Sequence, residues 1–184
     1  MLHGNKELWF AFLAMFLITG LYGLVVVLTR EIPPASELFG HGIGILGFLL
    51  MLMTEALYSL RKRSRSVKWG RMSIWLQFHI FTGLVGPYMV LLHISWKFNG
   101  IAGVSTLFTI IIVLSGFVGR YIFTRVPRTL DGLEIEGTLS QEALKQARRL
   151  LALWHTVHIP IGMVVFISAF VHIGAALYYA TFLK

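Results

Sequence analysis

Five apolar stretches, each long enough to cross a lipid bilayer, constrain this chain more than any other feature of its sequence. They cover about residues 8–29, 39–60, 72–96, 101–124 and 150–181. A helix crosses the hydrocarbon core in about 20 residues, and backbone inside lipid has to satisfy its hydrogen bonds within the helix. With 57% hydrophobic and 13% charged residues, the composition is that of a membrane protein. The sequence therefore predicts an all-α integral membrane bundle of five transmembrane helices, forming a single domain over residues 1–184.

The first apolar stretch is longer than the core of an ordinary secretory signal and lacks a clear small-residue cleavage site. We therefore expect it to be retained as the first membrane span.

The distribution of Lys and Arg predicts how the helices are oriented. Segments 61–71 and 120–149 each carry six of these cations, whereas the loops at 30–37 and 96–103 carry only one each. Cytoplasmic loops are enriched in Lys and Arg, so we expect the two basic segments and the N-terminus to be cytoplasmic and the C-terminus to lie outside. Topology and anionic headgroups account for the net charge of +8, and no nucleic-acid partner is predicted.

The cytoplasmic loop predicted at 125–149 is the one loop large enough for structure of its own. Its second half has a helical pattern, and Thr138 and Gln141 fit a capping box. No helix breaker follows before Pro160. We therefore expect the fifth helix to begin in the cytoplasm and to continue into the bilayer.

Four histidines repeat in a pattern on the third and fifth spans. The stretches HIFTGLVGPYMVLLH and HIPIGMVVFISAFVH begin at His79 and His158 and end at His93 and His172. Over fourteen residues a helix rises about 21 Å and turns through about 1400°, close to four full turns. Each helix therefore carries two imidazoles on one face, at two depths in the membrane.

The two helices also match in direction and depth. A single span lies between them, so they run parallel. His79 lies eight residues beyond Arg71, and His158 lies nine residues beyond Arg149, which places both at the same level near the cytoplasmic side. The other two histidines share the outer level. Two pairs of facing neutral imidazoles in an apolar bundle predict two non-covalent, bis-histidine haems b.

Glycines and the lack of cysteine support this interpretation. Gly83 and Gly162 each follow the inner histidine of their helix by four residues, on the side expected to face a porphyrin. On the second span, Gly40, Gly44 and Gly47 predict close helix packing or haem proximity. The chain has no cysteine, which excludes cysteine-ligated clusters and covalent c-type haem within it. Histidines hydrogen-bonded between membrane helices are the alternative, but the duplicated spacing favours ligands.

Four further residues are candidates for accessory roles. His155 is a reserve ligand, or a contact to a quinone or a haem propionate on the cytoplasmic side, although ordinary interfacial packing explains it as well. His41, near the outer end of the second span, is a candidate ligand at the outer level. Arg120 is expected either to neutralise haem propionates or to anchor the fourth span in the cytoplasm. Glu55 is expected to pair with the adjacent basic loop or to relay protons at a quinone site.

In this placement of paired histidines on spans three and five, the chain resembles the transmembrane di-haem cytochromes b. It is similar to the ferric reductase-like transmembrane domain shared by ferric reductases and NADPH oxidases. The resemblance covers about residues 40–181 and is specific at His79, His93, His158 and His172. It implies that electrons cross the bilayer through two haems. The chain departs from that family in that we expect five spans rather than six and expect no flavin- or nicotinamide-binding domain after the fifth.

The sequence predicts two haems but shows no recognisable substrate pocket. We therefore expect the chain to be an electron-transfer subunit of an oxidoreductase complex. We expect it in a bacterial inner membrane, as part of a respiratory chain, where it would exchange electrons with a quinone or with iron–sulfur, flavin or cytochrome c partners while contacting membrane lipid. A stand-alone ferric or quinone reductase is an alternative. A second alternative, from a different class, is a histidine-lined metal transporter.

Overall fold

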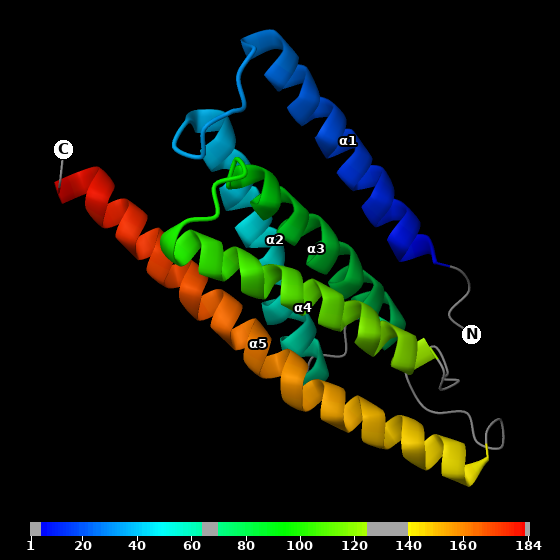
Figure 1. Cartoon of the computed structure of the whole chain (residues 1–184). Helices are drawn as coiled ribbons and strands as arrows, with labels where there is room; N and C mark the ends of the chain where they lie inside the picture. Colours follow the sequence, from blue (N-terminus) through cyan, green and yellow to red (C-terminus); the bar gives the residue numbers. More distant parts are fainter. Residues whose placement is uncertain (1–4, 64–69, 125–139, 183–184) are drawn as a thin grey trace. The chain divides into compact units, whose positions relative to one another are not determined.

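The computed structural model describes residues 5–63, 70–124 and 140–182, and all regular secondary structure in these ranges is helical (Figure 1). Every helix is long and apolar enough to span a membrane. This confirms the predicted fold class, and the chain is an integral membrane protein. In chain order the helices are α1 (Lys6–Thr29), α2 (Leu38–Arg63), α3 (Met72–His93), α4 (Gly100–Thr124) and α5 (Gln141–Phe182).

Helix α3 ends at His93, three residues before the predicted end of the third span. The reason is the backbone that follows: Ser95 and Trp96 have φ angles of 49° and 62°, in the left-handed region that cannot continue a right-handed helix. The hydroxyl of Ser95 also donates a hydrogen bond of 2.6 Å to the carbonyl of Pro33. This hydrogen bond connects the turn after α3 to the loop between α1 and α2.

Helix α5 is continuous over 42 residues. At 1.5 Å per residue it is about 63 Å long, roughly twice the thickness of a hydrocarbon core of about 30 Å. Its start at Gln141 and its continuation through Pro160 confirm the prediction that the fifth helix begins before the apolar span. Thr138, the predicted partner in the capping box, lies outside the described residues.

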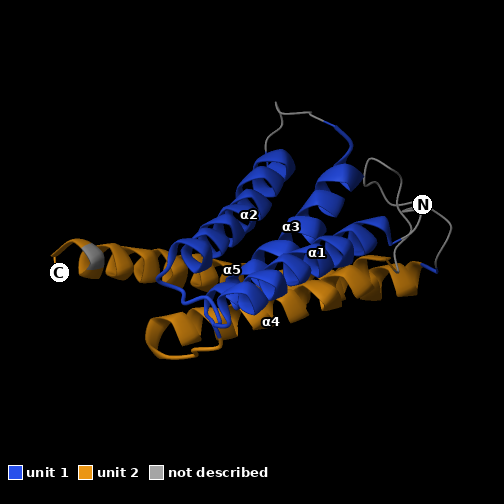
Figure 2. Ribbon diagram, turned by 90° about the horizontal axis from the view of Figure 1, so that it is seen from above, with its two compact units in different colours: residues 1–95, 126–140 blue, residues 96–125, 141–184 orange. Residues whose placement is uncertain are grey.

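The helices form two compact units, drawn in different colours in Figure 2. In the first unit, α3 packs against both α1 and α2, and in the second, α4 packs against α5. The four histidines of the repeated pattern are divided equally between the units: His79 and His93 belong to the first, and His158 and His172 belong to the second.

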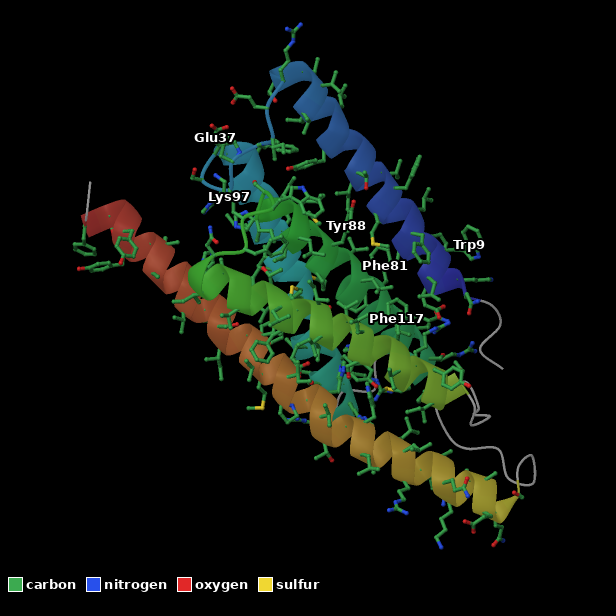
Figure 3. All side chains as sticks on the ribbon, in the orientation of Figure 1. Trp9, Glu37, Phe81, Tyr88, Lys97 and Phe117 are labelled. Atoms are coloured by element: carbon green, nitrogen blue, oxygen red, sulfur yellow. The ribbon has the colours of Figure 1, made fainter. Side chains whose placement is uncertain are left out.

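Small and apolar side chains form the contact between α1 and α3. Ala11, Val85 and Met89 are buried together at its centre. Tyr88 extends from α3 towards α1 (Figure 3) and shares a hydrogen bond with the hydroxyl of Thr19. The remaining surface of α1 is apolar and exposed, and the side chains on it suit contact with lipid.

The contact between α2 and α3 is closest at Gly47 and Gly86. A Cβ atom added to Gly86 would lie 2.9 Å from the carbonyl oxygen of Gly47, and one added to Gly47 would lie 2.8 Å from that of Gly86. Close helix packing at Gly47 is therefore confirmed. Nearby, the buried hydroxyl of Thr54 donates a hydrogen bond of 2.6 Å to that of Thr82, so this interface combines close backbone approach with a buried polar contact.

Candidate functional site

Both histidines of α3 turn the same ring nitrogen towards the backbone of α2. The Nδ1 atom of His93 lies 2.8 Å from the carbonyl oxygen of Gly40, and that of His79 lies 3.4 Å from the carbonyl oxygen of Thr54. A carbonyl oxygen can only accept, so in these contacts Nδ1 carries the proton and Nε2 keeps its lone pair. This is the tautomer that a histidine needs in order to bind a metal through Nε2, and a carbonyl partner is typical of such ligands.

The spacing of the two acceptors on α2 matches the spacing of the histidines on α3. Gly40 and Thr54 are fourteen residues apart, as the two histidines are. The glycines of the closest approach, Gly47 and Gly86, lie midway along the two intervals. A single antiparallel helix contact therefore provides an acceptor for both imidazoles, four turns apart.

At the C-terminal end of α3, the His93 ring lies against the surface of α2. A Cβ atom added to Gly44 would lie 2.6 Å from the His93 ring, so only glycine fits beneath it. His41 lies beside His93, with the ring centroids 6.2 Å apart and the planes nearly perpendicular. Its Nδ1 atom is 3.3 Å from the carbonyl oxygen of Ala35. The structure thus brings the His41 and His93 rings together.

In the N-terminal half of α3, His79 packs against Tyr58 of α2, with the ring centroids 4.7 Å apart. The amine of Lys62 lies 5.9 Å from the centroid of the Tyr58 ring. Glu55, on the same helix, accepts a hydrogen bond of 2.9 Å from Ser59. Much of the basic loop expected to pair with Glu55, residues 64–69, lies outside the described residues.

In the second unit, His158 is surrounded by two residues that the sequence did not single out. Its Nδ1 atom lies 3.0 Å from the hydroxyl oxygen of Ser115 on α4, and the indole of Trp154 packs against its ring with centroids 4.5 Å apart. The Nε1–H of Trp154 donates a hydrogen bond of 2.7 Å to the carbonyl of Ser115. A Cβ atom at Gly119 would overlap the indole, so the lack of a side chain there makes room for Trp154.

The other candidates lie on α4 and α5, and the edge of the His155 ring meets Trp154 with the ring centroids 4.7 Å apart. The Nδ1 atom of His155 lies 2.8 Å from the carbonyl of Leu151 on its own helix. His172 is half-buried, fourteen residues after His158. Arg120 is half-buried near the end of α4.

Gly83 and Gly162, the glycines expected to face a porphyrin, are not needed for packing between protein helices. A Cβ atom at Gly83 would meet only the Thr54 methyl carbon, at 3.6 Å, and one at Gly162 would meet only a methyl carbon of Ile112, at 3.8 Å. Both are ordinary van der Waals distances. Glycine inside a helix costs about 1 kcal/mol relative to alanine, and these contacts offer no compensation. Among the described residues, the contacts at Gly83 and Gly162 therefore give no packing reason for glycine at either position.

Sequence reasoning missed Ser115, Trp154 and the carbonyls of Gly40 and Thr54. Each lies on a different helix from its partner, except Trp154, which precedes His158 by one turn. In the hydrogen-bonding contacts between helices that involve these residues, the two partners are 25 to 53 residues apart along the chain. No local pattern marks such contacts, and the position of Trp154 next to a histidine was the one available signal.

Among the described residues, no group of three or more His, Asp or Glu side chains is placed to hold a metal ion. Comparisons with protein-family models, with curated proteins and with solved structures found no match. The functional assignment therefore depends on the histidines and on the residues that contact them.

Proposed function

We propose that this chain is a di-haem b-type membrane cytochrome that carries electrons across the bilayer, between a quinone or partner redox subunit and an acceptor. The observation that carries the proposal is the duplicated fourteen-residue histidine spacing. The contacts of His79 and His93 with α2 support it, because they leave both Nε2 atoms available for iron.

In this proposal the inner haem is bound by His79 and His158 and the outer haem by His93 and His172. The pairing follows from the parallel direction of the third and fifth spans and from the matched distances to the basic segments. A bound haem supplies reversible one-electron transfer. The chain holds the imidazole rings in place and excludes water with apolar side chains, and Arg120 offers a cation to inner propionates.

We also propose a bacterial inner membrane as the location, with the N-terminus in the cytoplasm and the C-terminus outside. Twelve of the 16 Lys and Arg residues lie in the two segments assigned to the cytoplasm. The chain would act as an electron-transfer subunit, with a quinone and with iron–sulfur, flavin or cytochrome c proteins as partners.

The first test is to purify the full chain from membranes and to measure its bound cofactors. A pyridine haemochrome assay and mass spectrometry should find two non-covalent haems b per chain, both low-spin because each iron has two imidazole ligands. Well-folded protein with stoichiometric zinc and no haem would contradict the proposal and favour metal transport. Reduction of a ferric chelate or quinone by the purified chain alone would instead indicate a stand-alone reductase.

The second test assigns the ligands by substitution. His79→Ala and His158→Ala should each remove the same spectral component, and His93→Ala and His172→Ala should each remove the other, because an open axial position loosens the haem. The matched control is His155→Ala, which should keep both haems, since seventeen residues separate it from His172 and place it about 100° away from the face that His158 and His172 share. Redox titration of the absorbance bands distinguishes the components. Loss of a haem in the control but not in His158→Ala would contradict the ligand assignment.

The same titration tests His41. His41→Ala should keep both haems, although the lost contact with the His93 ring is expected to alter the outer component.

A further inference from the structure

We propose that Ser115 and Trp154 are positioning residues for His158, and that the Ser115 hydroxyl sets the protonation of Nδ1 so that Nε2 can ligate iron. The inference rests on the proposed function and extends it to two residues outside the histidine pattern. It concerns only α4 and α5, which form one compact unit.

The geometry places one hydroxyl between two nitrogen atoms of α5. The Oγ atom of Ser115 lies 3.0 Å from Nδ1 of His158 and 3.2 Å from Nε1 of Trp154. The same indole nitrogen donates to the Ser115 carbonyl at 2.7 Å. Because indole N–H can only donate, the hydroxyl oxygen accepts from Trp154, and Trp154 thereby restrains Ser115 next to the imidazole.

The shape of α4 keeps the tryptophan in this place. The indole occupies the space where a Cβ atom of Gly119 would lie, and it packs on the His158 ring with an angle of 32° between the planes. A Cβ atom at Gly116 would be 4.0 Å from Cε1 of His158. Gly119 therefore makes room for the indole, whereas a side chain at Gly116 would make only an ordinary contact with His158.

A hydroxyl differs from the carbonyls that face His79 and His93, because it can donate as well as accept. If Ser115 donates to Nδ1, the proton of the neutral imidazole lies on Nε2 and His158 cannot ligate a metal. If Ser115 accepts from Nδ1–H, the lone pair of Nε2 is available. Iron binding requires the second arrangement. An acceptor on Nδ1–H makes the ligand more basic, which favours ferric iron and lowers the midpoint potential.

The alternative is that Ser115 and Trp154 only pack α4 against α5. In that case, removing the hydroxyl would change stability but would leave the potential and the spectra of the haems unchanged. The experiment therefore needs a spectroscopic readout specific to one haem, in addition to a measure of folding.

The test compares Ser115→Ala, Ser115→Thr and the control Ser105→Ala in the purified full chain. Ser105 lies on the same helix, and its hydroxyl donates to the carbonyl of Ile101 within α4. Optical redox titration and low-temperature EPR should show that Ser115→Ala raises the midpoint potential and shifts the low-spin signal of the inner haem alone. Its affinity for that haem should fall about 10- to 100-fold, the usual range for lost outer-shell contacts. Ser115→Thr should restore the wild-type values, and the control should match the wild type.

Trp154→Phe provides a second variant, which keeps an aromatic ring but loses the Nε1–H. It should shift the same component in the same direction by a smaller amount. Unchanged potentials and EPR signals in both Ser115→Ala and Trp154→Phe would overturn the inference, as would equal shifts in both haems. If Ser115→Ala does not fold, the midpoint potentials and EPR signals of Trp154→Phe and Ser115→Thr test the inference instead. Wild-type protein without haem would instead refute the proposed function, so the two failures are distinguishable.

Discussion

Gly86→Ala tests whether the closest approach of α2 and α3 positions the α3 histidines. A Cβ atom at Gly86 would lie 2.9 Å from both the carbonyl oxygen of Gly47 and the Cγ atom of Met51. Met51 has a flexible side chain and can move, but the carbonyl belongs to a helix backbone. Ordinary contact begins at 3.4 Å, so the helices have to separate by about half an ångström, and overpacking of this kind costs about 1–3 kcal/mol.

The same separation acts on the histidines, because the closest approach lies midway between them. The 2.8 Å contact of His93 with Gly40 would lengthen to a weak hydrogen bond, and the 3.4 Å contact of His79 with Thr54 would be lost. Alanine recovers about 1 kcal/mol through its higher helix propensity. We therefore expect Gly86→Ala to lower the free energy of unfolding by a net amount of up to about 2 kcal/mol.

The matched control is Gly83→Ala, one turn earlier on α3. Its Cβ atom would make ordinary contact with Thr54 at 3.6 Å, so the fold should be unchanged or more stable by up to about 1 kcal/mol. Haem content should nevertheless fall if a porphyrin lies against Gly83. The assay is unfolding of the purified chain in mixed micelles, followed by circular dichroism, with haem absorbance measured in parallel. Greater destabilisation by Gly83→Ala than by Gly86→Ala would refute the reasoning about this interface.

Two further predictions concern topology and the buried hydroxyl pair. The chain has no cysteine, so single cysteines introduced at Asn99 and Ser140 can be labelled without background; an impermeant reagent added from outside should reach position 99 and not 140, and the opposite result would invert the proposed orientation. Thr82→Val removes the acceptor of the hydrogen bond from Thr54 and should cost about 0.6–1.7 kcal/mol in the same unfolding assay. Thr106→Val is the control, because the buried hydroxyl of Thr106 donates only to its own helix; equal losses in the two variants would argue against a role for the hydroxyl pair.

The number and the approximate ends of the helices were predictable from the sequence because lipid leaves the backbone few alternatives. A spanning segment has to bond to itself, so an apolar run of about 20 residues is sufficient to indicate a helix. The long α5 was also predictable, since no breaker interrupts the chain from Gln141 to Pro160. The early end of α3 was not, because nothing local in the sequence marks Ser95 and Trp96 as left-handed.

The helical period also placed His79 with His93 and His158 with His172 on common faces, since one period applies to every α-helix. It did not reveal what each face contacts. Which oxygen meets each Nδ1 atom depends on the packing of a second helix, and in α4 that oxygen proved to be the hydroxyl of Ser115.

The glycines show most clearly what only the tertiary structure decides. Gly83 and Gly86 lie three residues apart on one helix, yet Gly86 is required for contact with α2 and Gly83 is not. In water, hydrophobicity would help to indicate which face of a helix is buried. In a membrane, lipid tails and protein side chains are equally apolar, so hydropathy carries little information about packing, and the partner of each face is decided by shape and hydrogen bonding in three dimensions.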